Sequence, residues 1–79
     1  MKIGALETPF SADTWGGFCW IAEGAKQYNP GWRWGQAWFS TLEAFHPELA
    51  DIIRGTELDP YHDDSKLDAF CEALVEWFK

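Results

Sequence analysis

The sequence lacks a hydrophobic run long enough to cross a membrane, and its first ten residues contain one lysine and no long apolar stretch. A membrane-spanning helix needs roughly 18 or more consecutive apolar residues. A signal peptide needs an apolar region of about 7–15 residues behind its positive end. We therefore expect no membrane segment and a cytoplasmic protein.

Basic residues are scarce. Among 79 residues, Lys and Arg number 6 against 13 Asp and Glu, which gives a net charge of -7. A protein that binds nucleic acid or anionic lipid directly does so largely through clustered Lys and Arg. The balance of charge argues against both kinds of partner, and we expect no direct nucleic-acid binding.

The chain also lacks the sequence patterns that mark common catalytic and metal sites. It contains no Cys-x-x-Cys pair, no His-Glu-x-x-His, no EF-hand spacing, no Gly-rich phosphate loop and no Gly-x-Ser-x-Gly turn. The two cysteines, Cys19 and Cys71, are expected as buried free thiols. We expect no enzyme, no metal and no cofactor.

Aromatic residues, in contrast, are abundant: 6 Trp, 6 Phe and 2 Tyr make up 18% of the chain. Each buries about 150–250 Å² when it is inside a core, so they can stabilise a domain this small. Trp20, Trp32, Phe39 and Phe10 fall off the predicted core stripes. We expect them to form an exposed apolar patch that binds a partner or a second copy of the chain. The alternative is that the N-terminal segment covers them.

Apolar periodicity predicts an all-α fold: a small bundle of about four helices in one domain over residues 1–79, with residues 1–10 as an extended arm. The first helix is expected to begin after a cap at Ser11 or Asp13 and to end near Tyr28. Its inner face would hold Trp15, Phe18, Cys19, Ala22 and Ala25.

Two further helices are predicted over residues 33–45 and 47–54. Pro47 suits the first turn of a helix, and Gly55 suits a C-terminal cap. Gly35, inside the earlier helix, indicates close packing of the backbone. The inner faces of both helices would hold Trp34, Trp38, Leu42, Phe45, Leu49, Ile52 and Ile53.

An irregular acidic segment follows, in which Asp59 and Pro60 are expected to begin a single helical turn. Ser65 is the predicted cap of the last helix, with Asp68 in the third position after it. The inner face of this helix would hold Leu67, Phe70, Cys71, Leu74, Trp77 and Phe78.

The middle of the chain resembles a family of small bacterial and phage proteins with no established activity. The resemblance rests on residues 32–39 (WRWGQAWF), 47–56 (PELADIIRGT) and 58–61 (LDPY). This chain departs from the family pattern at Ser40, where Asn is usual, and at His46, where Arg is usual. The resemblance implies a cytosolic protein of microbial or phage origin.

The negative charge is concentrated in the second half of the chain. Residues 1–42 are neutral overall, whereas residues 43–79 carry the whole net charge of -7. Helical spacing places residues 68, 72 and 76 on one side of the last helix. The candidate partner-binding acids are Glu57, Asp63, Asp64, Asp68, Glu72 and Glu76. Such a surface binds a basic protein, acts as a decoy of DNA, or only keeps the domain soluble.

A second hypothesis places a small-ligand or metal site around Arg33, Gln36, Arg54 and Asp59. Both arginines would bind an anion beside the tryptophans of the second helix, and the carboxylates of the 59–64 loop would bind a cation. The structural alternative is that Arg54 pairs with Asp59 across the turn and that Gln36 bonds to nearby backbone. The leading expectation from the sequence is a small acidic protein-binding module, an adaptor or an inhibitor.

Overall fold

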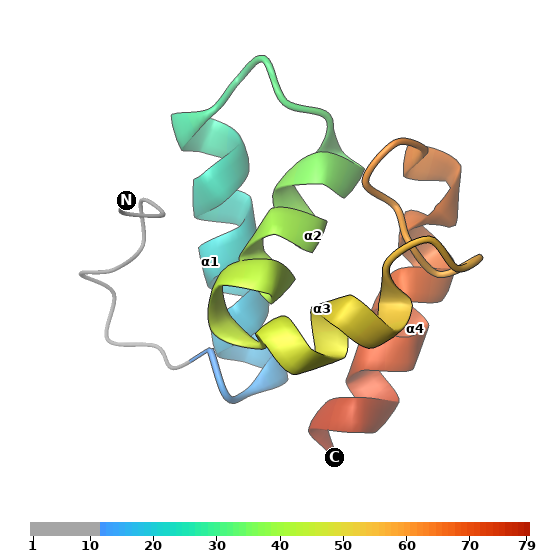
Figure 1. The fold of residues 1–79 in the computed structure, drawn as a ribbon. Coiled ribbons are helices and arrows are strands. Elements are labelled where there is room, and N and C mark those ends of the chain that lie inside the picture. Colours follow the sequence, from blue (N-terminus) through green and yellow to red (C-terminus); the bar gives the residue numbers. More distant parts are fainter. Residues whose placement is uncertain (1–11) are drawn as a thin grey trace.

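The computed structural model describes residues 12–79, so the predicted arm over residues 1–10, Phe10 included, lies outside the described residues. The described part contains four α-helices and one 3-10 turn (Figure 1). These are α1 (Trp15–Tyr28), α2 (Trp34–Phe45), α3 (Pro47–Ile53), η1 (Asp64–Lys66) and α4 (Leu67–Phe78). The prediction of an all-α bundle of about four helices is confirmed.

Local signals set the ends of α1. Thr14 is the N-cap, and its hydroxyl oxygen accepts a hydrogen bond of 3.1 Å from the amide of Gly17. The predicted cap at Ser11 or Asp13 is therefore wrong, because Thr14 is the residue that caps α1, which begins at Trp15. At the other end, the Asn29 side-chain amide donates to the carbonyl of Ala25 at 2.9 Å, which satisfies an end carbonyl.

The helices are arranged around α2. Helices α1 and α2 lie side by side, and α3 runs from the end of α2 toward α4 (Figure 1). The interior where they meet contains Phe18, Leu42, Phe70 and Leu74, all fully buried. Burying each such side chain stabilises the fold by about 1.5–3 kcal/mol relative to exposure.

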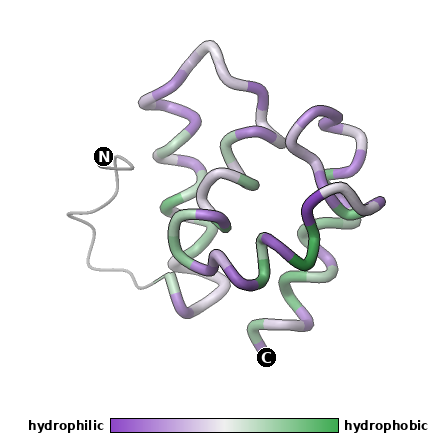
Figure 2. The backbone as a smooth tube through the Cα atoms, in the orientation of Figure 1, coloured by the Kyte–Doolittle hydropathy of each residue, from purple (hydrophilic) through white to green (hydrophobic). Residues whose placement is uncertain are grey.

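Three residues that the periodicity placed inside are exposed: Trp34 is 44%, Ile52 72% and Trp77 49% accessible. Helical periodicity defines an apolar side of a helix, but it does not say how much of that side another element covers. Trp34 stands in the first turn of α2, with the Lys26 ammonium 5.2 Å from its ring. The colouring by hydropathy shows the end of α3, which contains Ile52, as strongly hydrophobic (Figure 2).

The segment between α3 and α4 is irregular but well connected. Gly55 has a φ of 79°, which glycine adopts without strain, and it follows the C-cap of α3 as predicted. The Asp59 carboxylate accepts hydrogen bonds from the amides of Gly55 (2.8 Å) and Tyr61 (2.9 Å). A single hydrogen-bonded turn begins at Pro60, whose carbonyl accepts from the amide of Asp63 at 3.1 Å, as expected for this segment, but it is not part of a helix.

The start of α4 also differs from the prediction. Asp63, and not Ser65, supplies the cap: its carboxylate accepts from the Ser65 amide at 2.9 Å and from the Ser65 hydroxyl at 2.6 Å. The capped element is η1, which leads directly into α4 at Leu67. The two Ser65 hydrogen bonds hold the pKa of Asp63 below its usual value.

Candidate functional site

All the predicted partner-binding acids are exposed, but their hydrogen bonds and ion pairs differ. Asp64 is used structurally: its Oδ1 accepts a hydrogen bond of 2.9 Å from the amide of Gly35, in the first turn of α2, and lies 3.7 Å from Arg33 Nε. Asp63 caps η1. These two carboxylates therefore connect the loop to the helices.

The outer side of α4 is the least compensated part of the acidic surface. Asp68, Glu72 and Glu76 follow one another at four-residue spacing, and all three are exposed. Glu76 pairs with Lys79 at 2.7 Å. Asp68 and Glu72 form no salt bridge with any residue in the 12–79 range. Glu57 is also exposed, in the loop before η1.

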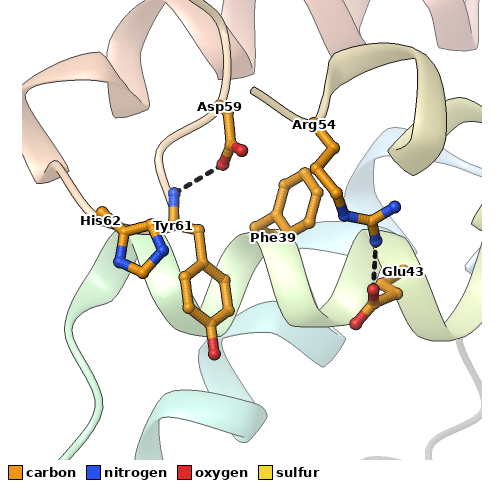
Figure 3. Close-up of a pocket in the computed structure, with 6 residues that line it drawn as sticks. All are labelled: Phe39, Glu43, Arg54, Asp59, Tyr61 and His62. Carbon is orange, nitrogen blue, oxygen red and sulfur yellow. Dashed lines mark hydrogen bonds and ion pairs between the residues drawn. The ribbon is translucent and has the colours of Figure 1, made fainter. Parts of the chain in front are cut away.

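A pocket of about 250 Å³ opens between α2 and the loop that follows α3 (Figure 3). Its lining consists of Phe39, Glu43, Arg54, Asp59, Tyr61 and His62. The Arg54 guanidinium lies 5.5 Å from the centre of the Phe39 ring, and it donates hydrogen bonds to Glu43 and Asp51. The bond to Asp51 and the charges of both acids raise the pKa of Arg54.

The predicted pairing of Arg54 with Asp59 is wrong. Arg54 reaches back to Glu43 and Asp51, whereas Asp59 accepts from backbone amides. Arg33 does not line the pocket: its guanidinium donates to the carbonyl of Tyr61 and lies beside Asp64. Nearby carboxylates thus offset the charge of both arginines, which weakens the attraction of this region for an anion.

Of the other residues of the ligand hypothesis, Asp59 lines the same pocket as Arg54, whereas Gln36 does not. Gln36 lies half-buried on α2. The oxygens of Asp59, Asp63 and Asp64 face separate backbone amides. Across residues 12–79, no three His, Cys, Asp or Glu side chains come together in a way that could hold a metal ion.

The candidate aromatic residues have different surroundings. Trp20 is 55% exposed on α1. Trp32 is half-buried and packs against the core. Phe39 is only 3% exposed, so its predicted place in an exposed apolar patch is wrong. Its ring packs against Phe70 inside and against Tyr61 at the pocket floor, with ring centres 6.4 and 6.0 Å apart.

Both cysteines are free thiols, and both are half-buried at the side of the core. Burial raises the pKa of Cys71 to about 11, with smaller contributions from Cys19 and Asp68. Burial and the charge of Glu23 also raise the pKa of Cys19. Neither thiol is activated as a nucleophile. No helix in the described part of the chain is both long and apolar enough to span a bilayer.

One further hollow was missed by the sequence analysis, because it depends on the exposure of Trp77. It also measures about 250 Å³ and lies where the last turn of α4 meets the corner between α2 and α3. Its lining consists of Phe45, His46, Pro47, Glu48, Leu49 and Trp77. A tryptophan at a helix end, with the charged Glu76 before it and Lys79 two residues after it, was the available signal.

No protein-family model, no curated protein and no solved structure matches the chain. The resemblance of about residues 28–64 to a bacterial and phage family stays a prediction that rests on the residues quoted above.

Proposed function

We propose that this chain is a small acidic protein-binding module, an adaptor or inhibitor of microbial or phage origin that acts in the cytoplasm. The observation that carries the proposal is the outer side of α4, where Asp68 and Glu72 are exposed and unpaired within residues 12–79. Like charges at four-residue spacing repel one another. A basic protein surface relieves that repulsion when it binds, and it is attracted from a distance.

Exposed aromatic side chains supply the apolar part of such an interface. Trp20 and Trp77 are each about half exposed, on α1 and α4 respectively. Tryptophan is the residue most enriched among those that dominate binding energy at protein interfaces. In this proposal, the acids steer the partner and the tryptophans hold it. A second copy of the chain is a less favoured partner, because the acidic halves of two copies repel.

The test is affinity capture from host-cell lysate at low and at high salt, with the bound proteins identified by mass spectrometry. We expect one basic protein to be retained at low salt and released at high salt. The charge reversal Glu72→Lys should reduce its recovery. Glu23→Lys, which makes the same change at an exposed position of α1, should not. Equal recovery with both variants would contradict the proposal.

The same captured protein separates this function from mimicry of DNA. A DNA mimic competes with duplex DNA for its partner, so added duplex should release the captured protein. A partner that stays bound in excess duplex is held at a surface other than its DNA-binding site.

A second candidate function is small-ligand binding in the pocket of Figure 3. The lining carries the acids Glu43 and Asp59 against one permanently charged base, Arg54, beside His62, so it favours a neutral or cationic ligand. A ligand that binds only the folded state raises the melting temperature. A thermal-shift screen of cations and neutral metabolites tests this, with Tyr61→Ala as the variant in which the shift should disappear.

A further inference from the structure

The hollow beside Trp77 has the features of a site for one side chain. Its volume of about 250 Å³ is below the roughly 300–1,000 Å³ of typical small-molecule sites. Its walls are the ring of Phe45, the edges of Pro47 and Leu49, and the exposed part of Trp77. An occupant must therefore be narrow, and apolar along most of its length.

Trp77 packs against two other rings in the structure. Its ring makes edge contacts with His46 and Phe78, with ring centres 5.0 and 5.1 Å apart. His46 is itself held, because its Nε2 donates to the carbonyl of Ala12 at 2.9 Å. Little side-chain freedom is left to lose on binding, which favours affinity.

The lining contains two polar side chains: the imidazole of His46, which is bonded to the Ala12 carbonyl, and the carboxylate of Glu48, which has no counter-ion within residues 12–79. Glu48 is exposed in the first turn of α3 and forms no salt bridge within residues 12–79. The neighbouring acids differ: Glu43 and Asp51 both pair with Arg54, and Glu76 pairs with Lys79. A carboxylate next to an exposed indole ring attracts a cation that can also stack on the ring.

We propose that this hollow binds an arginine side chain of the basic partner. The planar guanidinium stacks on Trp77 and donates to the Glu48 carboxylate, while its methylene stem lies along Pro47 and Leu49. Arginine suits the site better than lysine, because its guanidinium is flat, weakly hydrated and able to bond a carboxylate through two N–H groups. The proposal rests on the proposed function, whose partner it describes in more detail.

The direct test uses a blocked tripeptide, acetyl-Gly-Arg-Gly-amide, titrated into ¹⁵N-labelled protein. We expect shifts confined to the Trp77 indole and to the amides of His46, Glu48 and Leu49. The citrulline tripeptide, which has the same shape and no charge, should cause smaller shifts or none. Equal shifts with citrulline, or shifts centred on another surface, would overturn the proposal.

Two variants test the groups assigned. Glu48→Gln should weaken binding of the arginine tripeptide by about twofold to fivefold, the range for an exposed ion pair. Glu23→Gln removes the same charge from an exposed position of α1, outside the lining, and should have little effect. Trp77→Leu should weaken binding while the other amide signals show an intact fold. Equal effects of Glu48→Gln and Glu23→Gln would mean that only net charge matters, which contradicts the site.

Failure of this inference can be told apart from failure of the proposed function. If a basic protein is captured and Glu48→Gln leaves its recovery as unchanged as Glu23→Gln does, the module stands and the arginine site falls. If the tripeptide binds the hollow as described and no basic protein is captured, the site stands and the partner-binding function falls.

Discussion

Gly35 is the glycine whose replacement has the clearest structural consequence. A Cβ atom at this position would overlap the carbonyl oxygen of Pro60 and lie 2.9 Å from the Asp64 carboxylate. The sequence analysis expected close packing here, and the structure identifies the neighbour as the loop before η1. The loop can approach α2 this closely because Gly35 has no side chain.

Gly35→Ala should therefore lower the free energy of unfolding by about 1–3 kcal/mol, the usual cost of overpacking. Gly16→Ala is the matched control, because a Cβ there meets nothing within 4 Å and α1 gains a better helix former. It should be neutral or stabilising by up to about 1 kcal/mol. Urea denaturation of both variants checks this. Two variants of equal stability would contradict the close approach of the loop.

The cysteines give a pH-dependent prediction. Because the pKa of Cys71 is about 11 in the folded protein and 9.0 in an ordinary thiol, alkylation by iodoacetamide at pH 8 should be slower in the native state than in urea. The unfolded state loses its thiol proton first, so the free energy of unfolding should fall as the pH rises from 9.0 toward 11. Native thiols that react as fast as unfolded ones would contradict the burial.

At the scale of the elements, the first turn of α2 is held by a residue far along the chain. Arg33, the N-cap by position, makes no capping bond through its side chain, and Asp64 accepts from the Gly35 amide instead. Asp64 also lies beside Arg33. One carboxylate thus joins the start of α2 to the element that precedes α4.

Asp64→Ala should destabilise the protein by about 0.5–2 kcal/mol, as loss of a helix cap does. Asp64→Asn keeps an oxygen acceptor and should lose less. Glu72→Ala, which removes an exposed acid with no bond to backbone, is the control for charge. Chemical denaturation measures all three variants. An Asp64→Ala variant as stable as the control would mean that the cap is not formed.

These elements also show what the sequence could and could not predict. The C-terminal ends of α1, α2 and α3 follow from local signals such as Asn29, Pro47 and Gly55, so they were predicted within one residue. The cap from Asp64 was missed, since it joins positions 29 residues apart. The exposure of Trp77 was missed because periodicity marks an apolar side and does not reveal what covers it.

At the scale of the whole molecule, the repulsion between the acids of α4 lowers the free energy of unfolding. Glu72 lies four residues from both Asp68 and Glu76, so Glu72→Lys replaces two repulsions with two attractions. Each such pair is worth about 0.2–0.5 kcal/mol. The variant should thus be slightly more stable than the parent in urea. A destabilised variant would contradict the assignment of these three residues to one exposed side.

The same variant is expected to lose partner binding, which separates function from folding. In the proposed function, Glu72 contributes to partner binding at a small cost in the stability of the fold.

The most direct test of the account is the association rate of the captured basic protein, measured as a function of ionic strength. The Debye length, over which salt screens charges, falls from about 10 Å at 0.1 M salt to about 3 Å at 1 M. We predict a steep fall in the rate for the parent and for Glu23→Lys, and a distinctly shallower fall for Glu72→Lys. The same slope for all three proteins would show that the acidic side of α4 does not steer the partner, and would contradict the proposed function.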